Sequence, residues 1–389
     1  MGLNRQFEFA TSNRIVFGED ALLRTIPDIA ALGRRAFVVT GRRDSRRADP
    51  LVLPLRRIGV ETTCYPIGAE PTLETVAGGA RRAREAGCGV VIGMGGGSVI
   101  DAAKAVAAMQ TNPGDLRDYL EVIGNGKTLA QNPVPCVAIP TTAGTGSEVT
   151  RNAVLKSEDH RVKVSLRSPG MLPVLAIVDP VLTRSMPPAV TASTGMDALT
   201  QLIEPFLSNA ANPLTDGVCR EGLRMAACSL QRAFHNGGDA RAREGMALAS
   251  LFGGLALANA RLGAVHGIAG PLGGMFPAPH GVVCARLLAP VMRANLEAVR
   301  SRLPDSPVLG RFDEIARILT GDPGARAEAG VRRIGEICDE LAIPPLSRYG
   351  LTEADVEELV ANARQASSMK GNPVVLTDAE LGEILRAAM

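Results

Sequence analysis

The sequence has no tryptophan and only three tyrosines among its 389 residues. Its charges nearly cancel, with 42 Lys and Arg residues against 40 Asp and Glu residues. Basic pairs such as Arg34-Arg35 and Arg46-Arg47 are scattered along the chain without interleaved aromatic residues. Nucleic-acid-binding surfaces cluster basic residues and often add stacking aromatic side chains. We therefore expect no nucleic-acid partner and interpret the basic pairs as solvated helix faces.

Cysteine is also sparse, and no two of the seven cysteines form a C-x-x-C pair. An odd number without such a pair argues against a disulfide framework or a zinc knuckle and favours the reducing cytoplasm. The longest apolar stretch, Met246 to Ala258, is too short to span a bilayer and predicts a buried core helix. The segment Met1 to Ala10 lacks the shape of a signal peptide. No membrane partner is expected.

What the sequence does contain is an alternation of short apolar runs and helical segments in its first half. This pattern predicts a parallel sheet with helices on both faces, a Rossmann-like α/β domain over residues 1–182. A length of 389 residues is typical of two domains. The expected strands are Arg35–Thr40, Gly89–Gly93, Val134–Ile139 and Val174–Val178, and the expected helices are Thr72–Ala86 and Val99–Met109.

After Asp179-Pro180 the pattern changes to helices punctuated by glycine and proline. We expect an all-α domain over residues 183–389. No repeat of fixed period interrupts it. The expected helices include Ala192–Phe206, Asp216–Phe234, Ala242–Asn259, Pro323–Leu341 and Thr352–Ser368.

A glycine-rich turn, Gly93-Met-Gly-Gly-Gly-Ser98, lies between an expected strand and an expected helix. Glycines let backbone N–H groups approach a ligand, and a helix N-terminus attracts anions, so the turn suits a pyrophosphate. Ser98 is the expected N-cap. Asp101 and Lys104 in the next turns can face the ligand or pair with each other.

A second loop, Ile139 to Glu148, carries Thr141, Thr142 and two glycines after another expected strand. It is interpreted as a second wall of a phosphate and ribose site, although a loop without a ligand would also fit. The presence of two such loops, both after strands, favours the ligand.

Two histidines in apolar, glycine-rich surroundings, His266 and His280, are candidate metal ligands. The segment Thr194 to Gln201 resembles a helix start, with Asp197 and Gln201 on one face. Each histidine can instead be a satisfied core residue. An upstream carboxylate and two imidazoles would suit Zn²⁺ with an open position, or Fe²⁺. The other histidines, His160 and His235, lie in polar surroundings and are expected at the surface.

These segments together resemble the iron-containing alcohol dehydrogenase family, which includes glycerol dehydrogenase and, more distantly, dehydroquinate synthase. The resemblance extends over nearly the whole chain. It implies a dinucleotide-binding domain, a helical domain and a catalytic metal between them. The matching segments are Gly95–Lys104, Pro140–Glu148, Lys163, Ile177–Pro180, Thr194–Leu199, Gly263–His266, Pro271–Gly274, Pro279–Gly281 and Asn372–Pro373.

The resemblance also implies roles for individual residues. Metal ligands are expected at Asp197, His266 and His280, with Gln201 as a further candidate where family members carry a histidine. A second family histidine is replaced by Gly270, which leaves no named group to pass a proton to solvent. The residues expected to bind NAD or NADP are Gly95, Gly96, Gly97, Ser98, Asp101, Thr141, Thr142 and Lys163.

The choice between NAD and NADP depends on the turn after the first expected strand. Family members that exclude a 2′-phosphate tend to carry an aspartate where this chain has Gly41, and Arg42 and Arg43 follow it. Guanidinium groups bind phosphate well, so NADP is expected to be accepted, although both arginines can simply be solvated.

The expected activity is therefore metal-assisted hydride transfer between a small alcohol and its carbonyl form. Relatives imply a homo-oligomer, a dimer or larger. Three alternatives remain at this stage: a lyase like dehydroquinate synthase that uses the dinucleotide transiently, a dinucleotide-binding protein without turnover, and an oxygen-using iron enzyme.

Overall fold

The computed structural model describes residues 6–41, 45–68, 70–160 and 162–389. The described residues form two compact units. One contains residues 11–142 and 146–184, and the other contains residues 143–145 and 185–389 together with the described residues before Thr11. The predicted boundary after residue 182 falls two residues before the chain passes from the first unit to the second.

The first unit is built on a parallel sheet of six strands in the order β1-β8-β5-β4-β2-β3. This confirms the predicted parallel α/β domain. Its strands are β1 (Ile15–Phe17), β2 (Arg35–Gly41), β3 (Glu61–Ile67), β4 (Val90–Gly95), β5 (Cys136–Pro140) and β8 (Leu175–Val178).

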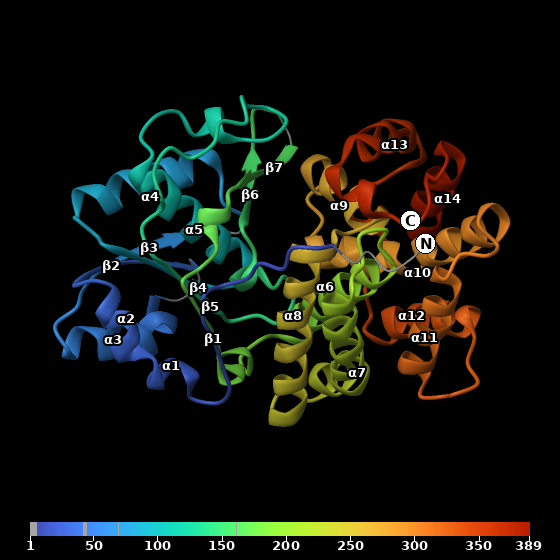
Figure 1. Cartoon of the computed structure of the whole chain (residues 1–389), viewed down its shortest axis with the longest axis horizontal. Helices are drawn as coiled ribbons and strands as arrows, with labels where there is room; N and C mark the ends of the chain where they lie inside the picture. The colour runs from blue at the N-terminus through green and yellow to red at the C-terminus, as the bar shows by residue number, and fades with distance from the viewer. Residues whose placement is uncertain (1–5, 42–44, 69, 161) are drawn as a thin grey trace. The chain divides into compact units, whose positions relative to one another are not determined.

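Helices cover both faces of this sheet, as Figure 1 shows. Alternate residues of β2 point to opposite faces, so Phe37 packs in one core and Val38 in the other. Helices α1 (Ala21–Arg24), α2 (Ile26–Leu32) and α3 (Asp49–Arg57) cover the Val38 face. Helices α4 (Leu73–Glu85) and α5 (Gly97–Thr111) cover the Phe37 face.

An antiparallel hairpin in this unit was not predicted. Strands β6 (Asn152–Ser157) and β7 (Val162–Arg167) pair with Lys156 opposite Lys163. Its strands bury alternate residues on one side only, so they lack the continuous apolar runs by which the sheet strands were recognised.

The second unit is helical, as predicted, and packs around one extended hydrophobic core. The helix expected over Ala192–Phe206 is present and begins four residues earlier, at Pro188, so the expectation that Thr194 lies at its start was wrong. Proline is favoured in the first helical turn, because its fixed φ suits the helix and its missing N–H has no intrahelical partner there. The helices are α6 (Pro188–Leu207), α7 (Pro213–His235), α8 (Ala240–Ala260), α9 (Ala264–Met275), α10 (His280–Arg302), α11 (Val308–Thr320), α12 (Ala327–Glu340), α13 (Val356–Gln365) and α14 (Asp378–Ala388).

Short 3-10 helices complete the connections. They are η1 (Ser45–Ala48), η2 (Leu116–Tyr119), η3 (Ser147–Val149), η4 (Pro169–Met171), η5 (Pro180–Thr183), η6 (Leu346–Tyr349), η7 (Glu353–Asp355) and η8 (Ser367–Gly371).

Two segments outside residues 185–389 belong to the helical unit. The backbone N–H of Ala10 donates to Oδ1 of Asn259 at 2.7 Å. Gly144 packs so closely on α6 that a Cβ there would lie 2.7 Å from Cβ of Thr194. Glycine is therefore required where the second predicted ligand loop touches α6.

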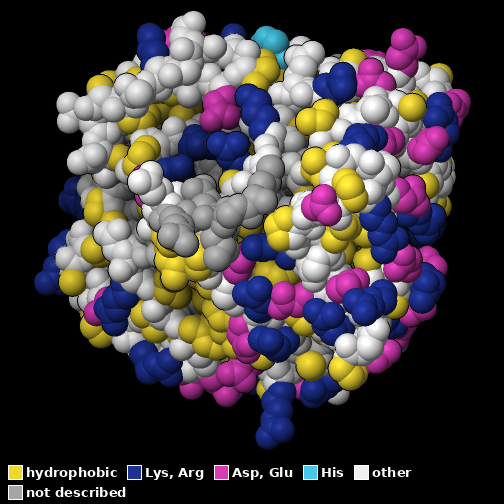
Figure 2. Space-filling model, turned by 45° about the vertical axis from the view of Figure 1, so that its right-hand side comes forward, with side chains coloured by type: hydrophobic (Ala, Val, Ile, Leu, Met, Phe, Trp, Pro, Cys, Tyr) yellow, Lys and Arg dark blue, Asp and Glu magenta, His cyan; other side chains and the backbone are white. Residues whose placement is uncertain are grey.

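The described part of the chain contains no single helix that is long and apolar enough to cross a membrane; α8 and α9 meet that test only as a pair bent by 99°. On the face seen in Figure 2, acidic and basic side chains are interspersed.

Candidate functional site

The glycine turn lies at the carboxyl end of β4, where the helix α5 begins. Gly96 is the N-cap, with φ −72° and ψ 179°, and α5 starts at Gly97. The expectation that Ser98 caps this helix was wrong, because the chain turns into the helix two residues earlier and Ser98 lies in its first turn. A Cβ on Gly95 would lie 2.6 Å from the Val99 side chain, so only glycine fits there.

The sheet topology gives this turn a position typical of nucleotide sites. β2 and β4 are neighbours, with Thr40 opposite Met94, while β3 and β5 extend the sheet in opposite directions. Ligands of open α/β sheets bind outside the carboxyl ends of the strands at such a switch in strand order. Gly41 and Gly95 end these two strands. Arg42 and Arg43 lie outside the described residues.

The second predicted loop is attached to the glycine turn. The N–H of Thr141 donates to the carbonyl of Gly95 at 2.9 Å. A Cβ on Gly96 would lie 3.4 Å from Oγ1 of Thr142. The two loops that the sequence singled out as phosphate-binding are therefore neighbours within one unit.

Asp101 and Lys104 pair with each other, at 3.0 Å between Lys104 Nζ and Asp101 Oδ1. Lys104 is fully buried and also donates to the carbonyl of Ser147 at 3.0 Å. Asp101 accepts from the Ser147 hydroxyl and from the N–H of Val154. The pair ties α5 to the segment 147–154.

Lys163 pairs with Glu70 at 2.5 Å and keeps only 10% of its side chain exposed. The roles of Asp101 and Lys163 toward a dinucleotide remain predictions.

In the helical unit, the three predicted metal ligands come together. Oδ1 of Asp197 lies 3.5 Å from Nε2 of His266 and 3.7 Å from Nε2 of His280. Asp197 on α6 and His266 on α9 are buried, while the His280 side chain at the start of α10 is 36% exposed. Three helices therefore each supply one side chain to the cluster.

A fourth side chain, which the sequence analysis did not single out, belongs to this cluster. Sγ of Cys284 lies 3.5 Å from Nε2 of His280 and 3.9 Å from Nε2 of His266. One ligand atom from each of the four residues lies within 4.8 Å of the others. The spacing of His280 and Cys284, four residues apart on one helix face, was the available signal.

The orientation of His266 is set by Glu204, another residue that the sequence analysis missed. Nδ1 of His266 lies 2.7 Å from Oε2 of Glu204, and the N–H of Val265 donates to Oε1 at 2.6 Å. Asn372 accepts from the N–H of Ala264 at 3.1 Å. Carboxylate and amide oxygens thus satisfy free N–H groups at the start of α9 and direct Nε2 of His266 toward Asp197.

The buried charges of the cluster alter one another's proton affinity. Burial opposes ionisation of Asp197, but the two imidazoles and the Gln201 amide outweigh it and hold the pKa of this carboxyl below its ordinary value. Burial also disfavours the His266 cation, but Cys284, Asp197 and Glu204 raise the pKa of His266 well above its ordinary value. The cluster therefore favours positive charge beside Asp197.

The donor set fits a divalent cation. Oδ1 of Asp197 faces two imidazoles yet, among the described residues, makes no hydrogen bond. A buried carboxylate oxygen left in that state is costly, and a cation would satisfy it. One carboxylate and two imidazoles form a ligand set that both Zn²⁺ and Fe²⁺ accept.

The two positions that depart from the family pattern lie close by in the chain. Gln201 is buried on α6, and its Oε1 has no hydrogen-bond partner within the described part of the chain. Gly270 lies one turn after His266 on α9, where a Cβ would meet no atom within 4 Å beyond its chain neighbours. The predicted surface histidines, His160 and His235, are both exposed.

Comparison with known families decides the assignment. The model of the iron-containing alcohol dehydrogenase domain matches residues 12–180, and that of the Fe-containing alcohol dehydrogenase C-terminal domain matches residues 191–389. The chain belongs to the iron-containing alcohol dehydrogenase family. This confirms both the resemblance and the two-part fold that the resemblance implied.

Curated relatives include members with different alcohols in their names. The chain is 35% identical to 1,3-propanediol dehydrogenase of Klebsiella pneumoniae over 99% of both chains. It is 38% identical to alcohol dehydrogenase 4 of Schizosaccharomyces pombe, over 82% of this chain and 73% of that one. It is 34% identical to choline dehydrogenase of Bacillus subtilis, over 92% and 89%.

Solved structures of the family agree with the fold. A 1,3-propanediol oxidoreductase superposes with a TM-score of 0.91 at 34% identity, over 99% of this chain and 100% of that one. A sulfoacetaldehyde reductase of Bifidobacterium kashiwanohense in complex with NAD⁺ superposes with a TM-score of 0.86 at 30% identity, over 99% of both.

Proposed function

We propose that this iron-containing alcohol dehydrogenase is an NAD(P)-dependent oxidoreductase that interconverts a small alcohol and its aldehyde or ketone with the help of a divalent metal. The family assignment supports the reaction class, an oxidoreductase acting on CH–OH groups. The observation that carries the metal-assisted part is the buried Oδ1 of Asp197, which faces His266 and His280 without a hydrogen bond from the described residues.

In this proposal, Asp197, His266 and His280 hold the cation, Fe²⁺ or Zn²⁺, with Gln201 beside them. The cation would supply Lewis acidity toward the substrate oxygen, and the dinucleotide would accept or donate hydride. Glu204 keeps the Nδ1 proton on His266, so that the Nε2 lone pair is available in the cluster. The buried side chains packed around Asp197 exclude water from that side and strengthen its electrostatics.

The dinucleotide is proposed to bind the first unit through backbone N–H groups of the glycine turn. No side chain of the described residues caps α5, so its start offers backbone N–H groups and the positive end of a fifteen-residue helix. The residues assigned to this site are Gly95, Gly96, Gly97, Ser98, Asp101, Thr141, Thr142 and Lys163, with Gly41 and Arg42 at the adenosine end.

We propose that NADP(H) is accepted as well as NAD(H). The support is the sequence at the end of β2, where Arg42 and Arg43 follow the exposed Gly41. No acidic residue lies between Gly41 and Asp44. An acidic side chain there would repel a 2′-phosphate, whereas guanidinium groups would bind it. Measuring kcat/KM with both cofactors tests this proposal, and a large preference for NAD(H) would contradict it.

For the substrate, the names of relatives point to primary alcohols and their aldehydes, mostly small ones, while one relative is a long-chain-alcohol dehydrogenase. They include 1,3-propanediol, choline, 4-hydroxybutyrate and sulfoacetaldehyde. A panel of these compounds and unsubstituted aldehydes, each with NAD(H) and NADP(H), is the direct screen. Because these substrates differ in charge, the panel also tests whether this chain prefers a neutral or a charged substituent.

The decisive experiment follows metal and turnover together. The full-length protein is stripped by chelation and dialysis, then reloaded with Zn²⁺ or Fe²⁺, and metal content is compared with alcohol oxidation. We expect turnover to be lost and restored with the metal, and His280→Ala to abolish both. Full activity of a rigorously metal-free parent protein would overturn the metal-assisted mechanism.

The same assays separate the alternatives. Net production of reduced cofactor excludes a lyase that uses the dinucleotide transiently, and binding without turnover over the panel would favour a non-catalytic protein. Turnover without oxygen excludes an oxygen-using iron enzyme.

We also propose a cytoplasmic location and a homo-oligomer, a dimer or larger; the seven free cysteines support a reducing compartment.

A further inference from the structure

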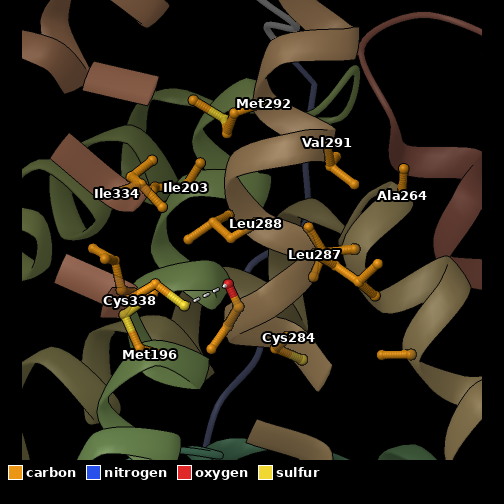
Figure 3. Close-up of a cluster of buried hydrophobic side chains, with 14 of the residues drawn as sticks. Met196, Ile203, Ala264, Cys284, Leu287, Leu288, Val291, Met292, Ile334 and Cys338 are labelled. Carbon is orange, nitrogen blue, oxygen red and sulfur yellow. Dashed lines mark hydrogen bonds between the residues drawn. The ribbon is translucent and has the colours of Figure 1, made fainter. Parts of the chain in front are cut away.

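Cys284 lies where a fourth ligand of the proposed metal would lie. It is buried on α10, one turn after His280, and Figure 3 shows it in the same cluster of buried side chains as Leu287 and Leu288. Its thiol lies near two imidazoles, whereas the buried thiol of Cys338 on α12 points to the backbone carbonyl of Ala285, 3.7 Å from its Sγ. The two cysteines share one core but have different surroundings.

The distances in the cluster match those within a tetrahedral metal site. With bonds of about 2.0–2.1 Å to nitrogen and oxygen and about 2.3 Å to sulfur, tetrahedral geometry separates ligand atoms by about 3.3–3.6 Å. Sγ of Cys284 lies 3.5 Å and 3.9 Å from the Nε2 atoms of His280 and His266. Oδ1 of Asp197 lies 3.5 Å from His266 Nε2 and 3.7 Å from His280 Nε2. Each of these four separations needs an adjustment of only a few tenths of an ångström, and the other two pairs of ligand atoms lie within 4.8 Å.

We propose that Cys284 is a thiolate ligand of the metal, so that the site of this chain is formed by Asp197, His266, His280 and Cys284. This inference rests on the proposed function, which requires a metal at the first three residues. A second observation points to a ligand here: Asp197 Oδ1, buried in the same cluster, has no hydrogen bond from any described residue. Gln201 offers only a neutral amide, whereas a thiolate brings negative charge to the cation.

A sulfur ligand strengthens the preference of the site for zinc. Soft thiolate ligands favour Zn²⁺, whereas all-oxygen sites suit Mg²⁺ or Mn²⁺. Adding a thiolate to one carboxylate and two imidazoles therefore reinforces the higher affinity for Zn²⁺ than for Fe²⁺ that such sites generally have. The site takes zinc in preference to iron when both are offered at equal concentration.

The test uses metal binding and spectroscopy on the full-length protein. Metal-free protein is titrated with Co²⁺, and sulfur-to-cobalt charge-transfer absorption in the near ultraviolet reports a thiolate ligand. X-ray absorption of the zinc-loaded protein then counts the zinc–sulfur bonds. We expect the charge-transfer band and one zinc–sulfur bond in the parent protein. Because this measurement needs no variant, misfolding of a variant cannot produce the result.

Two variants assign the sulfur. Cys284→Ala should lose the charge-transfer band and bind Zn²⁺ at least about tenfold more weakly. A loss of about tenfold is already typical when a residue that only hydrogen-bonds a metal ligand is removed. Cys338→Ala, the buried control from the same core, should keep both. Circular dichroism and dinucleotide affinity verify that each variant is folded.

The outcomes separate this inference from the function on which it rests. Metal binding with only nitrogen and oxygen ligands would overturn the role of Cys284 and leave the proposed function standing. If the parent protein binds neither Zn²⁺, Co²⁺ nor Fe²⁺, both proposals are wrong.

Discussion

Nδ1 of His266 lies 2.7 Å from Oε2 of Glu204, although the two residues are 62 positions apart in the chain. Both side chains are buried, with 8% and 5% of their surface exposed. The carboxylate accepts a hydrogen bond from Nδ1–H and so directs Nε2 toward Asp197, His280 and Cys284. It is a positioning residue for the proposed metal.

Replacing Glu204 should therefore weaken metal binding. In Glu204→Gln one carboxylate oxygen becomes an NH₂ group, which accepts no hydrogen bond. The side chain then keeps one acceptor oxygen where the carboxylate has one for His266 and one for the N–H of Val265. We expect metal affinity to fall by about 10–100-fold. Zinc titration of metal-free protein measures this. Glu314→Gln, which removes a carboxylate paired with Arg220 on another helix, is the control. Equal zinc affinity in folded Glu204→Gln protein would contradict the positioning role.

Gln201→His should strengthen the metal site. Gln201 lies one turn after Asp197 on the same face of α6, so a histidine there adds an imidazole next to the carboxylate. Imidazole is a better ligand for Zn²⁺ and Fe²⁺ than a neutral amide. We expect affinity to rise by about tenfold, which corresponds to ~1.4 kcal/mol. Competition with a chromophoric chelator gives the constant for the parent, Gln201→His and Gln201→Ala proteins. A histidine variant that binds metal no better than the alanine variant argues against this geometry.

Gly96→Val should impair dinucleotide binding while the protein still folds. The backbone of Gly96, with φ −72°, accepts any residue, and a Cβ there meets Thr142 at an ordinary 3.4 Å. A branched side chain would nevertheless fill the space that phosphate needs above the turn. We expect affinity for NAD(H) to fall by at least about tenfold, ~1.4 kcal/mol.

Calorimetric titration with NADH compares this variant with Gly217→Val. Gly217 lies on α7, where an added Cβ meets nothing within 4 Å beyond its helix neighbours. The control should bind like the parent protein. Unchanged affinity in folded Gly96→Val protein would exclude the glycine turn as the phosphate site.

The stability of the protein should depend on Glu148 between pH 4.5 and 7. Burial raises the pKa of Glu148 from 4.5 to about 7, although its own backbone N–H and Lys104 partly oppose this. Below about pH 4.5 the carboxyl is protonated in both states. Above that pH only the unfolded chain releases the proton, so stability falls until about pH 7, by at most on the order of 3 kcal/mol.

Glu148→Gln removes this titration. Urea unfolding of both proteins between pH 4.5 and 7.5 measures the difference in stability, which should move in favour of the variant as pH rises. In the difference between the two stability curves, the contributions of all other titratable groups that the two proteins share cancel. Parallel stability curves would show that Glu148 ionises as readily in the folded as in the unfolded protein.

Much of the fold could be predicted because its signals are local in the chain. The apolar runs that became β2, β4, β5 and β8 are buried on both faces, which is why they contain few polar residues. The glycine turn is equally local, since its strand, turn and helix follow one another between Val90 and Thr111. His266 and His280 stood out because histidine is rare in this chain and both lie in apolar segments, and the family resemblance added Asp197 to them as an expected ligand.

Only the tertiary structure decided what surrounds those residues. Cys284 shares a helix face with His280, but only the packing of α6, α9 and α10 brings that face to Asp197 and His266. Glu204 reaches His266 through the same packing, and no spacing in the sequence encodes which helix faces meet. The hairpin of β6 and β7 and the pairing of Lys104 with the carbonyls of residues 147–152 depend in the same way on contacts between distant segments. Sequence periodicity determines which face of an element is buried, whereas the identity of its neighbours depends on how all the elements pack at once.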